Sequence, residues 1–403
     1  MITLASFKNK RGLVSVFIAM IIVSMLSAVL IFVESSKQKA IGTSVLSLEQ
    51  LWGESILGEY DLNLQEKYGL FGFYGTYNTT TAKLDKMAEY TFSGKRYINY
   101  GGASCDVYDY ALTGKEIFKV QMIEAAKYDL PILHGENDNQ GEVQPDRSIE
   151  NRRILNSLPS AEYDFGFSVS DFTDGFKALK SMEDIWEAGK SKRYTLKYVE
   201  KYFKNATEDK NLGETFFSKE MEYIICGKNS DVKNEREVGN IIIAVREIMN
   251  MQHLNTDPEK SALLTAAAEA LTPGPAALVT KQSLAAAWAL AESINDYKLL
   301  TNGRTVQFIK TKESWAIDLD SVLNNTADKY IDTGCETGNE YKDYLRCFLL
   351  LMSEDKMIVR TMDLIQINMK YLYYGDFLLR EYNAGCDMKL YVNGKDYEFT
   401  SKY

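Results

Sequence analysis

The chain has 403 residues, 45% hydrophobic and 25% charged, which is typical of folded globular protein and too long for one small domain. The first 33 residues carry three of the 46 basic residues and no acidic one. The rest of the chain therefore has 43 basic and 56 acidic residues, a net charge of −13. Such an acidic chain does not bind nucleic acid through bulk charge, so we expect no nucleic-acid partner.

An uncharged apolar run, GLVSVFIAMIIVSMLSAVLIFV, occupies residues 12–33. A helix rises about 1.5 Å per residue, so this run is roughly 33 Å long and can cross a hydrocarbon core of about 30 Å. The polar side chains in it are Ser15, Ser24 and Ser27, whose hydroxyls can bond to a helix backbone. The sequence therefore predicts a transmembrane helix over residues 13–33 and the lipid bilayer as a partner.

The charges beside this run predict its orientation. The basic residues Lys8, Lys10 and Arg11 precede it, with Gly12, and Glu34 follows it. By the positive-inside rule, residues 1–12 form a cytoplasmic tail. We therefore expect a single-pass protein of the cytoplasmic membrane with its N-terminus inside and its C-terminal domain extracellular.

A cleaved signal peptide is the alternative interpretation of the same run. The run exceeds the ~7–15 residues usual for the apolar part of a signal peptide. The segment VESSKQKA that follows offers no clear small-x-small cleavage site. Both observations favour an uncleaved anchor.

A helical pattern continues beyond the apolar run. Apolar residues recur at spacings of three and four, which places them on one helix face: Ile41, Val45, Leu48, Trp52 and Ile56. The charged residues, Glu49 among them, fall mostly on other faces in this interpretation. We expect one helix over about residues 13–66, with an amphipathic extension (34–66) packed on the following domain, and with glycines 42, 53 and 58 permitting bends.

Residues 67–403 are predicted to form a mixed α+β domain with antiparallel strands. The first part reads as a turn into a strand (67–75), a helix near 80–90, strands within 91–112, a helix over 114–130 and a polar loop (134–146). A helix-rich section follows over about 170–300, with a possible strand at 163–169 and a break at TPGP (272–275). A strand at 303–311, a long helix over 341–374 and a hairpin over 389–403 around Asn393-Gly394 complete the domain.

The five cysteines are scattered, and no CxxC motif occurs. Cys335, Cys347 and Cys386 share the C-terminal third and are the more plausible source of a disulfide. The alternative, that all five are small buried apolar residues, is equally consistent with the sequence.

No catalytic or metal-binding motif is apparent. The only histidines, His134 and His253, stand in no recognisable motif, and GxSxG, HExxH and phosphate-binding loops are absent. A partial calcium-loop pattern from Glu136 carries Arg147 where the bidentate glutamate belongs. Acidic pairs such as Asp318/Asp320 and Glu59/Asp61 are expected by chance among 56 carboxylates. We therefore expect no enzyme activity and no cofactor.

Several segments resemble a family of Gram-positive bacterial envelope proteins of unknown function, associated with tight-adherence (Tad/Flp) pilus assembly. These are RGLVSVFIAMIIV at the anchor, EYDLNLQEKYGLFGF (59–73), EYIICGKNSDVKNEREV (222–238), FIKTKESW (308–315) and YKDYLRCFLLLMSEDKMIVRTMDLIQINMK (341–370). The resemblance implies a membrane-anchored envelope protein and assigns no catalytic residues.

The layout also resembles, more distantly, TadE/TadG-like minor pseudopilins. Those proteins carry a glutamate at the fifth position after the glycine that precedes prepilin cleavage, and the fifth residue after Gly12 is Phe17. This departure favours a membrane-retained protein over a processed pilin subunit.

Two functions fit the sequence. The first is a non-enzymatic structural or assembly component of a Tad/Flp-type pilus or related surface apparatus, with pilus-assembly or minor pilin proteins as partners. The second is a membrane-anchored extracellular binding module, such as a sensor or cell-wall-associated receptor. The sequence does not indicate an oligomeric state.

Overall fold

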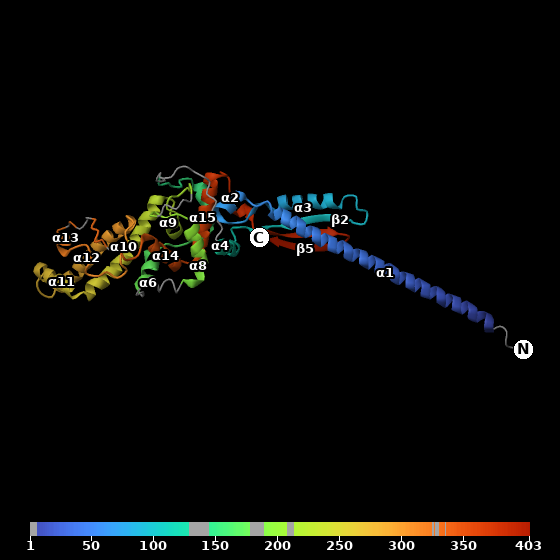
Figure 1. Cartoon of the computed structure of the whole chain (residues 1–403), viewed down its shortest axis with the longest axis horizontal. Coiled ribbons are helices and arrows are strands. Elements are labelled where there is room, and N and C mark those ends of the chain that lie inside the picture. Colours follow the sequence, from blue (N-terminus) through green and yellow to red (C-terminus); the bar gives the residue numbers. More distant parts are fainter. Residues whose placement is uncertain are drawn as a thin grey trace. The chain divides into compact units, whose positions relative to one another are not determined.

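The computed structural model of the chain describes residues 6–128, 145–177, 189–207, 213–324, 326, 330–334 and 336–403. The fold is α+β, as predicted, with helices predominating and antiparallel strands (Figure 1). Two compact units are built from interleaved segments. We call Met1–Tyr60, Phe73–Tyr110 and Asn383–Tyr403 the helix–sheet unit, and Asp61–Gly72 with Ala111–Tyr382 the helical unit.

The chain begins with α1 (Ser6–Leu57), a single 52-residue helix. The prediction that this helix reaches about residue 66 is wrong. A turn follows Leu57, and a separate helix, α2 (Leu62–Tyr68), begins because the Asp61 carboxylate accepts the backbone N–H of Leu64 at 2.8 Å and caps it. α2 then ends at Gly69, which adopts the left-handed conformation (φ 65°) that glycine tolerates best.

The helix–sheet unit contains a three-stranded antiparallel sheet in the order β2-β4-β5. Its strands are β2 (Tyr100–Asp106), β4 (Gly385–Val392) and β5 (Lys395–Lys402). The predicted hairpin is confirmed, because Asn393 and Gly394 both adopt positive φ angles (53° and 77°) and join β4 to β5. The short β1 (Phe73–Tyr74), α3 (Tyr77–Phe92) and η1 (Tyr108–Tyr110) complete this unit.

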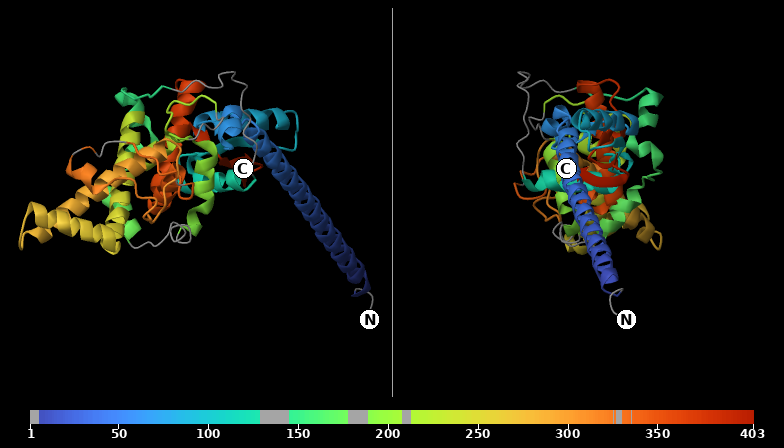
Figure 2. Two further views of the ribbon diagram at one scale, coloured as in Figure 1. Left: turned by 60° about the vertical axis from the view of Figure 1, so that its left-hand side comes forward. Right: turned by 90° about the vertical axis from the view of Figure 1, so that its right-hand side faces the viewer.

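Helices α1 and α3 share one core with the sheet. β4 alternates buried and exposed residues along most of its length, so one of its faces points into this core. The core contains side chains from all three layers: Ile41, Val45, Trp52 and Ile56 from α1, Leu84, Ala88 and Phe92 from α3, and Cys105, Met388, Leu390 and Val392 from the strands. The N-terminal part of α1 runs on beyond the sheet as an isolated helix (Figure 2).

The helical unit is an assembly of helices around α15 (Glu354–Leu372), in which every residue from 356 to 369 is buried. Its other elements are α4 (Lys115–Tyr128), α5 (Arg152–Ser157), η2 (Pro159–Glu162), α6 (Val169–Lys177), η3 (Lys190–Lys192), α8 (Arg193–Tyr202), α9 (Glu220–Cys226), α10 (Asp231–Thr256), α11 (Pro258–Leu271), α12 (Ala277–Thr301), α13 (Leu319–Leu323), α14 (Tyr341–Leu351) and η4 (Leu379–Glu381). β3 (Tyr382–Asn383) leads toward β4. The predicted helix-rich section and the break at 272–275 are confirmed.

Four further predictions need correction. The helix expected over 341–374 is two helices, because α14 ends at Leu351 and the Ser353 side chain then caps the start of α15. The segment 303–311 forms no strand beyond an isolated bridge between Val306 and Asn339. Within 91–112 only β2 is a strand, and the described residues 163–169 contain none. Most of the predicted loop 134–146 lies outside the described residues.

Candidate functional site: the anchor helix and the unit it enters

The first half of α1 exposes its apolar side chains. From Val14 to Val33 the large hydrophobic residues are between 41% and 72% exposed, with Phe17 at 63%. Ser24 and Ser27 donate their hydroxyls to the carbonyls of Ile21 and Val23, at 2.8 Å each, so neither needs water. This stretch is long and apolar enough to cross a membrane.

The residues predicted to set the topology lie at the two ends of this stretch. Gly12 and Glu34 are exposed. Lys8, Lys10 and Arg11 fall in the first turns of α1, where the side chains lie outside the described part of the structure. Their role in orientation stays a prediction.

The second half of α1 packs on the sheet through the predicted stripe. Ile41, Val45, Trp52 and Ile56 are at most 5% exposed, and Leu48 is partly buried against the same core. The Trp52 ring meets Phe92 of α3 edge to face, with ring centroids 5.8 Å apart. One helix therefore supplies both the apolar span and one layer of a folded unit.

Two glycines face β5 and let α1 approach the sheet closely. A Cβ on Gly42 would lie 3.4 Å from the Tyr397 ring, which is ordinary contact. A Cβ on Gly53 would lie 2.8 Å from Ser401 Oγ and 2.9 Å from Met388 Cε, which is too close. Close packing between helix and sheet therefore requires glycine at Gly53, whereas Gly42 has room for a methyl group.

Glu49 lies on the packed face of α1, whereas the sequence pattern places it among the charged residues of the other faces. It follows Val45 by four residues and precedes Trp52 by three, and its side chain is fully buried. Neither carboxylate oxygen has a hydrogen-bond partner, and burial raises the pKa of Glu49 to about 7. The spacing of the stripe, four residues after Val45 and three before Trp52, is the signal in the sequence that identifies Glu49 as buried.

A protein-family model matches residues 142–394, more than half of the chain. The chain belongs to DUF5702, a family of unknown function. No curated protein and no solved structure matches it. The matched segment covers the described helices from α5 onward and strand β4, whereas α1, α3 and β2 of this DUF5702 protein lie outside it.

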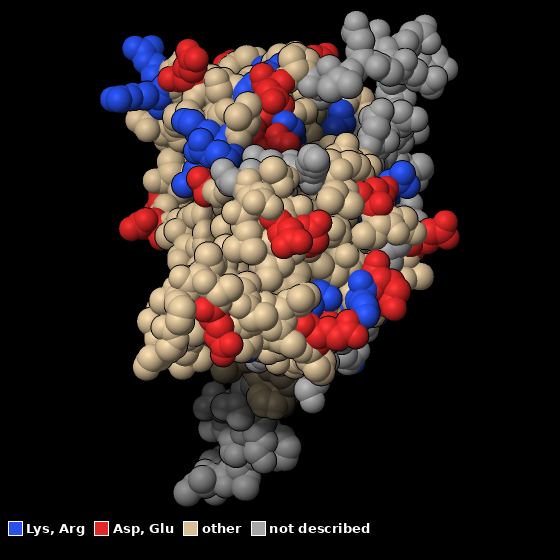
Figure 3. Space-filling model, turned by 90° about the vertical axis from the view of Figure 1, so that its left-hand side faces the viewer, with Lys and Arg blue, Asp and Glu red and all other residues tan. Residues whose placement is uncertain are grey.

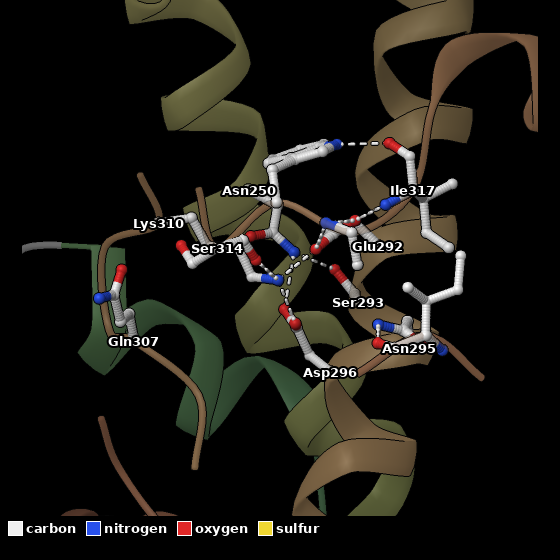
Figure 4. A network of polar contacts seen from close by, with 12 residues as sticks. Asn250, Glu292, Ser293, Asn295, Asp296, Gln307, Lys310, Ser314 and Ile317 are labelled. Carbon is white, nitrogen blue, oxygen red and sulfur yellow. Dashed lines mark hydrogen bonds and ion pairs between the residues drawn. The ribbon is translucent and has the colours of Figure 1, made fainter. Parts of the chain in front are cut away.

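Within the matched segment, α10 and α12 enclose a buried polar network (Figure 4). The Lys310 ammonium pairs with Glu292 and lies 2.6 Å from Asp296 Oδ1. The Arg246 guanidinium donates to Asp296 at 2.9 Å and to the carbonyls of Gln307 and Phe308 at 3.0 and 2.9 Å. The backbone N–H of Ile317 donates to Glu292 at 2.8 Å.

The charges of this network balance, with two carboxylates against two cations. Burial raises the pKa of Glu292. Burial also raises the pKa of Asp296, but the charges of Arg246 and Lys310 more than offset this and hold it below its usual range. Lys310 occupies the position between the two carboxylates. Together with the backbone contacts of Arg246 and Glu292, the network holds the 307–317 segment on α10 and α12. A metal site there is not supported.

His253, the described histidine, lines a shallow depression of 450 Å³ at the start of α11. Its ring stacks on Trp315, with centroids 5.3 Å apart, and burial lowers its pKa. The neighbouring Asp257 carboxylate accepts the backbone N–H groups of Glu259 and Lys260, at 2.9 and 3.1 Å, and so caps α11. These contacts are structural and do not form a nucleophile–base pair.

The other acidic pairs named from sequence also have structural partners. Asp318 caps α13 through the N–H of Ser321 at 2.6 Å. Asp61 caps α2, and Glu59 pairs with Lys83 of α3. The residues that the structure describes contain no cluster of three or more metal-ligating side chains. The segment of the partial calcium pattern before Pro145 lies outside them.

The four described cysteines are buried. Cys347 lies in α14, and Cys335 is outside the described residues. Cys386 of β4 lies beside Cys105 of β2, and a hydrogen bond between their thiols lowers the pKa of Cys105 and raises that of Cys386. The pairing suggested among the three C-terminal cysteines is therefore not formed by the described ones.

The hairpin of α11 and α12 exposes apolar side chains around the TPGP turn. Leu263, Leu271, Leu278 and Val279 are 55–66% exposed. Uncharged residues cover much of the face of the helical unit on which these helices lie (Figure 3). Exposed apolar surface of this kind is typical of interaction sites.

Proposed function

We propose that this DUF5702 protein is a non-enzymatic, membrane-anchored assembly component of a Tad/Flp-type pilus or related surface apparatus in a Gram-positive cell. The observation that carries the proposal is α1, which is exposed and apolar over residues 14–33 and then packs on a sheet through Ile41–Ile56. An anchor continuous with a folded unit holds that unit at a fixed position next to the bilayer.

The orientation in this proposal follows from charge. Lys8, Lys10 and Arg11 remain in the cytoplasm, so both compact units lie outside the cytoplasmic membrane. There the units are positioned to contact minor pilins or other assembly proteins. The apolar α11–α12 hairpin offers one surface for such contacts.

The helix-on-sheet arrangement supports the resemblance to minor pseudopilins, because in both a long N-terminal helix is half apolar span and half packed layer. Phe17 replaces the glutamate that a pilin would carry at this position. The anchor therefore stays in the bilayer in this proposal, and the protein acts during assembly without joining a filament.

A deletion strain tests the proposal. We expect it to lose surface fibres and adherence, and we expect the full chain to restore both. Replacing residues 1–33 by a cleaved secretion signal should fail to restore fibres, whereas an unrelated single-span anchor of the same orientation should succeed. Normal fibres and adherence in the deletion strain would contradict the proposal, as would a gene locus without pilus-assembly genes.

A further inference from the structure

A cavity of 320 Å³ lies within the helical unit, in the size range of sites for small molecules. It is bounded by the segment at Asp164–Gly166, by the start of α6 and by the junction between α14 and α15. All of these elements belong to the helical unit, so the cavity does not depend on α1 or on its proposed role.

Lys356 makes this cavity chemically distinctive. Its side chain lines the cavity and is only 8% exposed, yet its ammonium has just one hydrogen-bond acceptor, the carbonyl of Gly166 at 2.6 Å. It forms no ion pair within the described residues. Burial lowers the pKa of Lys356 and the nearby Arg360 lowers it further, whereas the charge of Asp171 partly offsets both. A buried ammonium with no carboxylate within ion-pair distance favours an incoming anionic group.

Two further cations lie near Lys356. Lys356 lies 6.0 Å from the centre of the Phe167 ring, and Lys228 lies 5.2 Å from the same centre. Arg360, one turn along α15, is 5% exposed and donates to the carbonyls of Ile224 and Ile225. None of these three cations forms an ion pair with a described carboxylate.

The acids of the first turn of α15 are engaged elsewhere. Glu354 pairs with Lys119 at 2.8 Å and accepts the Thr195 hydroxyl at 2.8 Å. Asp355 pairs with Lys115. Neither carboxylate therefore pairs with Lys356, which lies in the first turn of the same helix.

The remaining walls indicate which kind of anion fits. Phe172 and Met352 are buried apolar residues, and Leu351 adds a half-buried one. Asp164 and Asp171, both exposed, also line the cavity. These two carboxylates disfavour a multiply charged anion and favour a ligand that also carries an amine.

We propose that this cavity binds a free apolar α-amino acid. Its carboxylate pairs with Lys356, its side chain packs against Phe172, Leu351 and Met352, and its ammonium faces Asp164 and Asp171. Binding gives Lys356 an ion-pair partner and requires no rearrangement of the ion pairs of Glu354 and Asp355.

Calorimetry on the full chain in detergent tests the proposal with three probes. L-Leucine carries all three groups, 4-methylpentanoate lacks the amine, and L-leucinol lacks the carboxylate. We expect leucine to bind most tightly, 4-methylpentanoate more weakly and leucinol at least tenfold more weakly than leucine. No binding of leucine at millimolar concentration, or equal binding of leucine and leucinol, would overturn the proposal.

Three variants separate the contacts. Lys356→Met should weaken leucine and 4-methylpentanoate at least tenfold, while Lys370→Met in the last turn of the same helix should leave both unchanged. Asp171→Asn should weaken leucine but leave 4-methylpentanoate unchanged. Thermal unfolding of each variant checks folding. A folded Lys356→Met variant that binds leucine as well as the parent protein would refute the assigned site.

Discussion

Glu49 is the residue at which the chain departs most clearly from ordinary core packing. The other residues of the α1 stripe are apolar, whereas Glu49 is a fully buried carboxyl group whose oxygens have no hydrogen-bond partner. The lack of hydrogen-bond partners favours the protonated form of Glu49, because burying a neutral carboxyl group costs less free energy than burying a carboxylate. The stability of the helix–sheet unit should therefore depend on pH through this side chain.

The direction of that dependence follows from the raised pKa. The folded-state pKa is about 7 against an ordinary value of 4.5, so between these values the folded state binds more protons than the unfolded state. The contribution of Glu49 to stability is fully present below about pH 4.5 and is lost as pH rises through 7. We predict that Glu49→Gln raises the melting temperature at pH 8 by roughly 4 °C, the effect of about 1 kcal/mol.

The exposed Glu54 on the same helix is the matched control. Glu54→Gln should leave the pH profile of the melting temperature unchanged, because this side chain is in solvent. The measurement is thermal unfolding of both variants between pH 5 and pH 8. A Glu49→Gln profile that runs parallel to that of the parent protein would show that the carboxyl does not titrate in this range.

Gly53 and Gly42 form a second matched pair on α1. Alanine at either position improves helix propensity by up to about 1 kcal/mol. At Gly53 the added methyl group collides with Ser401 and Met388, whereas at Gly42 it makes an ordinary contact with Tyr397. We predict that Gly53→Ala is less stable than Gly42→Ala by about 1–3 kcal/mol in denaturant titration. Equal stability would mean that α1 does not approach the sheet this closely.

At the scale of elements, the buried network of Figure 4 fixes the 307–317 segment on α10 and α12. Lys310→Met leaves Glu292 and Asp296 with one cation between them, so one buried carboxylate loses its compensation. We predict a loss of about 3–5 kcal/mol in the free energy of unfolding. Lys312→Met, which breaks the exposed pair with Glu259, should leave the free energy of unfolding nearly unchanged, because solvent screens this pair. Similar losses in the two variants would contradict the role of the network.

The same network explains why the strand predicted over 303–311 is absent. The alternation of Val306, Phe308 and Lys310 suits a strand, but Arg246 takes the carbonyl oxygens of Gln307 and Phe308. No sequence pattern shows that a side chain from α10 will bind this backbone. The break before α15 is a different case, because Ser353 followed by Glu354 and Asp355 is a helix-start signal visible in the sequence.

At the scale of the whole molecule, local sequence patterns predict the individual helices and turns but do not predict which elements pack together. The apolar run, the α1 stripe and the Asn393-Gly394 turn each depend on neighbouring residues, and their structures follow from the sequence. The helix–sheet unit instead pairs β2 with β4, in a register that joins Tyr100 to Val392 from distant parts of the chain. Nothing in either strand specifies the other.

The candidate site shows the same limit. The exposed apolar span and its packed continuation follow from hydropathy and spacing. The cavity at Lys356 does not, because a lysine three residues into a helix ordinarily reaches solvent. Its burial depends on Phe167, Phe172 and the 164–166 segment, which lie far from it in sequence.

The topology of α1 tests the central claim most directly. Ser6→Cys and Ser36→Cys place a thiol on either side of the apolar span, and the parent protein, whose four described cysteines are buried, gives the background labelling. On intact protoplasts, a membrane-impermeant maleimide should label Ser36→Cys, and it should label Ser6→Cys only after permeabilisation. Labelling of Ser6→Cys on intact protoplasts, protection of Ser36→Cys, or loss of the residue 6 thiol from the mature protein would contradict an uncleaved anchor with its N-terminus inside.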